Sequence, residues 1–102
     1  MQNQPNDHQH QQVQIKTTDE ALKGKYSNMV QILHTKEEFV MDFLLIHPHT
    51  GGQLLNRMVL SPGHMKRLAK VLGENLERYE TNFGKIEEGE SPTKGDFGFE
   101  TK

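Results

Sequence analysis

The order of elements within residues 26–86 limits the fold more than any other feature of the chain: three strand-like runs come first and one long amphipathic helix follows. The runs cover 28–34, 38–46 and 53–60, and side chains alternate between two faces most clearly in the second. The Pro and paired Gly of 47–52 are typical of a loop. Because short loops join consecutive strands, the sequence predicts an antiparallel three-stranded meander.

A long helix is predicted directly after the third strand. Ser61 suits the N-cap position, and Pro62 suits the first helical position, where its missing N–H needs no partner. Gly84 suits the end of the helix. Spacings of three and four residues link the apolar side chains Met65, Leu68, Ala69, Leu72, Leu76, Tyr79 and Phe83. The predicted fold class is therefore α+β, an antiparallel β-meander followed by one long C-terminal α-helix in a single domain at 26–86.

The N-terminal residues are far more polar than this domain. Only 32% of the chain is hydrophobic, below the roughly 45–50% of an average globular protein, and the deficit is concentrated at the two ends. Residues 1–14 are rich in Gln, so we expect a disordered polar tail. Residues 15–25 are an ambiguous lead-in, in which Val13 and Ile15 could add an edge strand and a short helical turn could precede Gly24.

The C-terminal residues 87–102 are acidic and poor in aliphatic side chains, so we expect a second disordered tail there. It contains the sequence Phe97-Gly98-Phe99, and two aromatic side chains are unusual in such a segment. We interpret Phe97 and Phe99 as a candidate docking motif for a protein partner. The alternative is that the two side chains are incidental.

Both faces of the predicted sheet are apolar, which one helix cannot cover. The face of the middle strand through Phe39 and Phe43 suits contact with the helix. The opposite face carries Val40, Leu44 and Ile46, whereas a sheet face exposed to water is normally polar. A domain of this size is also marginal alone. We therefore predict a two-fold homodimer with Val40, Leu44 and Ile46 in the interface.

The charges of the predicted helix are arranged in two halves. Lys66, Arg67 and Lys70 lie in the first half, whereas Glu74 and Glu77 lie in the second, an order that opposes the helix dipole. Two such helices packed antiparallel would place each basic half beside the acidic half of the other. We therefore assign Glu74 and Glu77 to the dimer interface. The alternative is that all these charges are solvated and have no partner.

No set of residues with catalytic spacing is found. The chain has no cysteine, and its paired glycines lack the spacing of a phosphate-binding loop. His47 and His49 are weak candidates for binding zinc or nickel, because no carboxylate or Cys completes a ligand set. Asp42, in the middle of a strand, could be a buried acid with a raised pKa, could face a sheet edge, or could pair across the dimer with Arg57 or a His. We predict a non-enzymatic protein without a cofactor.

Nucleic-acid binding is the main alternative to a protein partner. A net charge of −2 does not favour it, since nucleic-acid-binding proteins usually carry a clear basic excess. The cluster of Lys66, Arg67 and Lys70 could still contact phosphate groups at the helix start. A dimeric meander with one helix is also similar in architecture to single-strand-binding transcription cofactors. A dimerisation module for an unrelated protein partner is the third possibility.

The sequence contains no targeting or membrane signal that we recognise. The N-terminal stretch lacks the apolar core of a signal peptide, and no apolar run reaches the roughly 18 residues of a membrane span. We therefore expect a cytoplasmic protein.

Four runs of this sequence, at 26–32, 38–43, 57–66 and 72–86, together resemble a family of small prokaryotic proteins defined only as a domain of unknown function. The distinctive parts are Phe-Val-x-Asp-Phe at 39–43 and Tyr-Glu-x-x-Phe-Gly at the helix end. The resemblance brings no enzymatic activity and no set of functional residues. Members in Bacteroidota are commonly encoded directly after the gene for the largest, β′, subunit of RNA polymerase. The resemblance therefore implies a polymerase-associated accessory protein, for which Phe97, Phe99 and the basic helix residues are candidate contacts.

Overall fold

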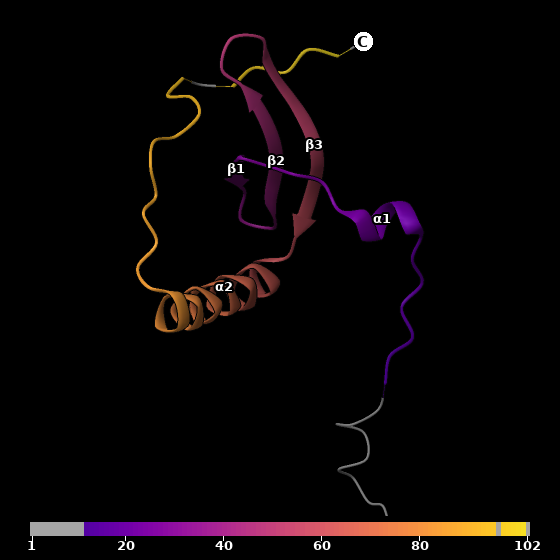
Figure 1. Cartoon of the computed structure of the whole chain (residues 1–102). Helices are drawn as coiled ribbons and strands as arrows, with labels where there is room; N and C mark the ends of the chain where they lie inside the picture. The colour runs from indigo at the N-terminus through magenta and orange to yellow at the C-terminus, as the bar shows by residue number, and fades with distance from the viewer. Residues whose placement is uncertain (1–11, 96, 102) are drawn as a thin grey trace, which may run out of the picture.

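A computed structural model describes residues 12–95 and 97–101, so most of the expected N-terminal tail lies outside the described residues. Five elements follow one another along the described chain (Figure 1). They are α1 (Asp19–Lys23), β1 (Met29–His34), β2 (Phe39–His47), β3 (Gly51–Leu60) and α2 (Pro62–Phe83). The predicted fold class is confirmed: three antiparallel strands in the order β1-β2-β3 precede one long helix.

Two short turns join the strands. In the first, the backbone N–H of Thr35 donates to the Glu38 carbonyl at 2.9 Å, and the Thr35 hydroxyl accepts from the backbone N–H groups of Glu37 and Glu38. In the second, Gly51 has φ +96°, a backbone conformation that favours glycine. A Cβ atom at Gly52 would lie 2.7 Å from the Ile46 side chain, so the paired glycines allow this hairpin to close tightly.

The start of β1 is fastened to β2 by side chains. The Asn28 amide accepts from the Ile46 backbone N–H at 2.8 Å and donates to the Ile46 carbonyl at 3.1 Å. The Ser27 hydroxyl donates to the Leu44 carbonyl at 2.8 Å. These bonds satisfy backbone groups of β2 beyond the end of the regular ladder, which keeps the upper part of the sheet paired.

The lead-in contains a helix but no strand. The Thr18 side chain caps α1 by accepting from the Ala21 N–H, and Gly24 ends it with φ +76°, as predicted. The expected edge strand through Val13 and Ile15 is wrong, because residues 12–18 pair with no strand and both side chains are exposed.

Alternation along the strands gives the sheet two distinct faces. We call one the tail face; it carries Met29, Val40, Asp42, Leu44, Leu54, Arg57 and Val59. We call the other the open face; it carries Val30, Ile32, Phe39, Met41, Phe43, Met58 and Leu60. The register places Met41 between Ile32 and Met58 on the open face, whereas Asp42 and Arg57 interrupt the apolar side chains of the tail face.

The helix α2 forms as predicted at both ends. Ser61 caps its start by accepting from the His64 N–H at 3.2 Å, and Pro62 occupies the first position. Gly84 ends it with φ +97°. Its 22 residues span about 33 Å at 1.5 Å per residue.

The helix does not lie over the sheet as expected. Figure 1 shows it at the foot of the sheet, across the strand direction. Only Met65 and Leu68, near its start, are half-buried, and no residue of α2 is fully buried. The physical reason is the connection: β3 ends at Leu60 and α2 begins at Pro62, so a single residue joins them. Folding back over the sheet would need a longer turn.

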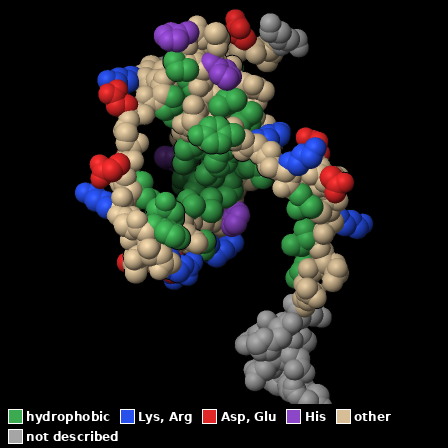
Figure 2. All heavy atoms as spheres, in the orientation of Figure 1, with side chains coloured by type: hydrophobic (Ala, Val, Ile, Leu, Met, Phe, Trp, Pro, Cys, Tyr) green, Lys and Arg blue, Asp and Glu red, His purple; other side chains and the backbone are tan. Residues whose placement is uncertain are grey.

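The buried core is consequently small. Among the described residues only Met41, Leu44 and Leu60 are buried apolar side chains, and all lie in β2 or at the end of β3. Figure 2 shows the result: hydrophobic side chains gather over the sheet and along the neighbouring part of α2, and many are accessible. A single copy of the chain therefore leaves much of its apolar surface uncovered.

Candidate interaction surfaces

The only polar residue buried in the described part of the sheet is Asp42, at the centre of the tail face. Its side chain is 1% exposed and accepts two hydrogen bonds from the Arg57 guanidinium, at 2.7 Å from Nε and 2.8 Å from Nη2. These bonds, together with the positive charge, lower the pKa of Asp42 below its ordinary value, although burial opposes the shift. The same contact raises the pKa of Arg57. Asp42 is therefore held ionised, which rules out the alternative of a raised pKa.

A β-bulge selects the partner of Asp42. The hairpin pairs Leu44 with Leu54, and an irregularity follows between Phe43 and Leu44, so that Phe43 pairs with Asn56 and Asp42 with Arg57. Without the extra residue in β3, Asn56 would lie opposite Asp42. Pairing with Arg57 was among the predicted alternatives, but the pair forms within one chain and not across a dimer.

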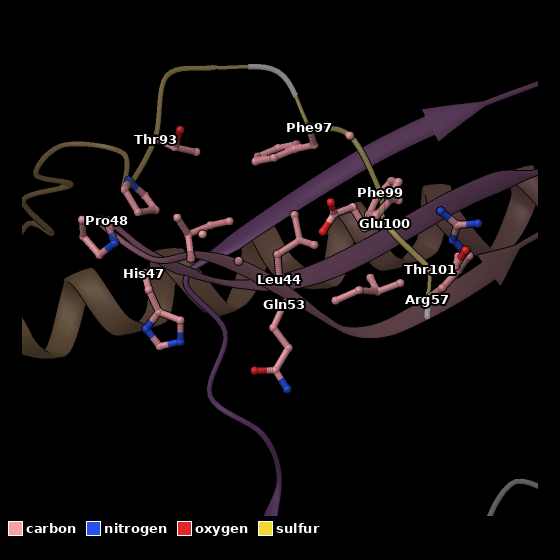
Figure 3. A pocket seen from close by; sticks show the side chains of 16 residues that line it. Leu44, His47, Pro48, Gln53, Arg57, Thr93, Phe97, Phe99, Glu100 and Thr101 are labelled. Carbon is pink, nitrogen blue, oxygen red and sulfur yellow. The ribbon is translucent and has the colours of Figure 1, made fainter.

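The C-terminal segment, residues 84–95 and 97–101, runs back from α2 along the sheet and crosses the tail face (Figure 1). An open groove of about 770 Å³ lies between this segment and the β2–β3 hairpin. Figure 3 shows Phe97 and Leu44 on opposite sides of this groove, with Arg57 at one end beside Phe99. The guanidinium carbon of Arg57 lies 5.6 Å from the centre of the Phe99 ring, within the range of a cation–π contact.

The predicted docking motif is therefore partly engaged with its own chain. Phe97 is half-buried, whereas Phe99 remains 47% exposed. The segment forms no helix or strand among its described residues, and its backbone makes no hydrogen bond to the sheet there. The contact is made by side chains alone, so the segment can leave the groove without breaking the sheet.

The predicted interface residues of the sheet and of α2 differ in their exposure. Leu44 is only 4% exposed, and Ile46 lines the groove beneath the C-terminal segment, so neither presents a free surface. Val40, on the same face nearer α2, is half-buried. On α2, Glu74 and Glu77 are exposed. The structure thus does not bring the five predicted interface residues together on one surface.

The basic cluster of Lys66, Arg67 and Lys70 is exposed on α2 and forms no ion pair with any described residue. With 3.6 residues per turn, Arg67 and Lys70 point away from the apolar side of the helix, whereas Lys66 lies on its flank. That apolar side is the largest feature that the predicted site omitted. Leu72, Leu76 and Tyr79 are about half exposed and Phe83 is 74% exposed. The amphipathic spacing of α2 identifies this apolar side, but the helix was expected to bury it against the sheet.

The described histidines do not gather into a metal-binding group. Among the described residues no group of three or more His, Asp or Glu side chains could hold a metal ion. His47 and His49 lie on the exposed β2–β3 turn. His34 lies at the other end of the sheet, where it packs against Phe39 with ring centres 5.3 Å apart. None of the described helices has the length and apolar character that crossing a membrane requires.

These features define a small α+β protein, a three-stranded meander with one long helix whose apolar side is largely exposed among the described residues. The chain belongs to the family described as "Protein of unknown function (DUF3467)", which matches residues 1–88. The match includes the N-terminal segment, which the resemblance in sequence had left outside, and ends before Phe97 and Phe99. No curated protein and no solved structure matches the chain.

Proposed function

We propose that this chain is a non-enzymatic interaction protein of the transcription machinery, an accessory protein that contacts RNA polymerase in the cytoplasm. The interaction role rests on one observation: α2 and the open face leave large apolar side chains uncovered. Contiguous apolar patches larger than a few hundred Å² are uncommon on monomeric proteins and mark sites of association. The choice of polymerase rests on the resemblance to a family commonly encoded beside the β′ subunit gene.

The polymerase contact is proposed at the C-terminal segment and the outer side of α2. Phe99 is half-exposed and rests on the side chain of Arg57, so exchange of this contact for a partner's surface disturbs little else. Lys66, Arg67 and Lys70 are solvent-exposed; Arg67 and Lys70 lie away from the apolar side of α2, and Lys66 lies on its flank. They supply charge that steers association and fixes orientation, while aromatic side chains supply buried area.

Affinity capture of the tagged chain from its own cells, with nuclease treatment and mass spectrometry, tests the proposal. Stoichiometric recovery of polymerase subunits after nuclease treatment supports it. Loss of polymerase on nuclease treatment contradicts it and favours the nucleic-acid alternative, in which binding of labelled single strands weakens steeply with salt. Recovery of the chain alone also contradicts it.

Substitution of the two phenylalanines tests the contact surface. The double change of Phe97→Ala and Phe99→Ala is expected to reduce polymerase recovery strongly. Tyr26→Ala is the matched control, since Tyr26 is an exposed aromatic residue distant in sequence from the segment. Equal recovery with the double variant and the control would exclude the C-terminal segment as the contact.

A further inference from the structure

Beyond Met65 and Leu68 at its start, the apolar side of α2 packs against none of the described residues, although a helix of this composition needs a partner. Its second half carries Leu72, Leu76, Tyr79 and Phe83, all half-exposed or more, with the Tyr79 and Phe83 rings stacked 5.0 Å apart. Most helical stability in proteins comes from packing of an amphipathic face and not from propensity. The dipole adds no support, since the first turn of α2 holds no acidic residue and the last turn no basic one.

The open face of the sheet is uncovered in part. Met41 and Leu60 on it are buried, but Val30 and Ile32 on one side of Met41 and Met58 on the other are each about 41–51% exposed. Figure 2 shows hydrophobic side chains over the sheet and along α2, adjoining at the angle between them. A polypeptide segment bound between the open face and α2 would cover both of these apolar surfaces.

We propose that the occupant is a second copy of this chain, whose α2 packs antiparallel against α2 of the first and over its open face. Each copy then supplies the helix that the other lacks, and a two-fold axis passes near the middle of the helix pair. The interface is thus formed by α2 and the open face. It differs from the tail-face interface expected at Val40, Leu44 and Ile46, which the chain's own C-terminal segment occupies in part.

The available area is adequate for a stable dimer. Aromatic side chains bury about 150–250 Å² each. Because Tyr79 and Phe83 are half-exposed or more, a large part of that area on each ring can still be buried by a partner. Together with the exposed parts of Leu72, Leu76, Val30, Ile32 and Met58, the surface is on the order of the ~800 Å² per partner that stable interfaces bury.

Charge selects the antiparallel arrangement over a parallel one. Lys66 and Glu80 are about four helical turns apart, so they lie on the same flank of the apolar side. In an antiparallel pair whose centre is near Gly73, Lys66 of each copy lies beside Glu80 of the other, and two equivalent ion pairs form. A parallel pair would instead place basic halves together and acidic halves together.

Sedimentation of the purified full-length chain at micromolar concentration is the first test, and a dimer is expected. Leu76→Glu should convert it to a monomer, because the new charge would be buried at the centre of the helix pair. Leu33→Glu is the control, as Leu33 is similarly exposed but lies on the tail face. A monomeric wild-type chain, or a dimer that Leu76→Glu leaves intact, overturns the proposal.

Charge reversal tests the arrangement without disturbing the apolar contact. Lys66→Glu alone and Glu80→Lys alone should each weaken the dimer on the order of tenfold, because each places like charges at two symmetric positions. The double variant carrying both changes should restore the wild-type dissociation constant, since the pairs re-form with opposite polarity. Lack of rescue in the double variant overturns the antiparallel arrangement. These measurements use the purified chain, so they are independent of whether polymerase is the partner.

Discussion

The strand β2 and the helix α2 carry similar apolar side chains, yet their surroundings are opposite. β2 pairs on both sides and holds two of the three buried apolar residues together with the buried Asp42. The helix is longer and well capped, but no residue of it is buried. The strand is thus stabilised by its own chain, whereas the helix keeps most of its apolar side exposed, and the proposed second copy would cover it. Substitutions should distinguish the two regions by whether their effect depends on protein concentration.

The largest effect is expected from Leu44→Ala in β2. Leu44 is buried, so removing its side chain leaves a cavity and should lower the free energy of unfolding by about 2–4 kcal/mol. The same change at Leu76 in α2, where the side chain is 55% exposed, should cost less than about 0.5 kcal/mol at dilutions where the chain is monomeric.

Urea denaturation at two protein concentrations measures this difference. The Leu44→Ala loss should be similar at both concentrations, whereas the Leu76→Ala loss should grow at the higher one, where a second copy covers the helix. Equal losses for both variants in the dilute protein would mean that α2 is packed within its own chain.

The second effect concerns the charge pair on the tail face. Asp42→Ala removes both hydrogen bonds to Arg57 and leaves space beneath the C-terminal segment, so a loss of about 1–3 kcal/mol is expected. Glu37→Ala, in the exposed turn between β1 and β2, is the control and should be near neutral. The free energies of unfolding of both variants, measured by denaturant titration, check this expectation. A neutral Asp42→Ala would show that the ion pair between Asp42 and Arg57 does not stabilise the fold.

The same pair predicts how stability depends on pH. Because the folded pKa of Asp42 lies below its ordinary value of 3.8, the unfolded chain binds more protons in this range. The stability from this group is therefore present above pH 3.8 and is lost as the pH falls through the lower, folded pKa. Asp42→Asn, followed by thermal unfolding between pH 2 and 6, should show a shallower decline in stability on acidification than the wild type. An unchanged slope would contradict the lowered pKa.

Much of the local structure was predictable because its causes are local in sequence. Alternation gave the three strands, and Ser61, Pro62 and Gly84 gave both ends of α2. How these elements pack against one another was harder to predict. The one-residue connection at Ser61 was visible, but its consequence, that the helix cannot cover the preceding sheet, is geometric.

The site was predicted less well, for two physical reasons. The partner of Asp42 depends on an extra residue in β3, and no residue type in that strand marks the bulge in advance. The position of Phe99 on Arg57 depends on the path of a segment without regular structure. Such contacts join residues far apart in sequence, and neither periodicity nor turn chemistry specifies them.

A moderate effect is expected from the N-cap of α2. Ser61→Ala leaves the His64 N–H without its side-chain acceptor and should reduce stability by about 1 kcal/mol. Ser61→Asp keeps an acceptor and should be neutral or slightly stabilising, because a negative charge suits a helix N-terminus. Circular dichroism of the helical signal during denaturation measures both. If α2 is stabilised from outside, the Ser61→Ala loss should be most visible in dilute protein.

The smallest effect on stability is expected from Phe99→Ala. Its ring is nearly half exposed and contacts the half-exposed Arg57, so unfolding free energy should change less than with Ser61→Ala. Local mobility is the more sensitive measure: NMR order parameters of residues 97–101 should fall, while the amides of β2 remain protected from hydrogen exchange. A large loss of sheet protection would show that the C-terminal segment is an integral layer of the fold. Its removal would then expose Leu44, and the contrast between a self-sufficient strand and a dependent helix would no longer hold.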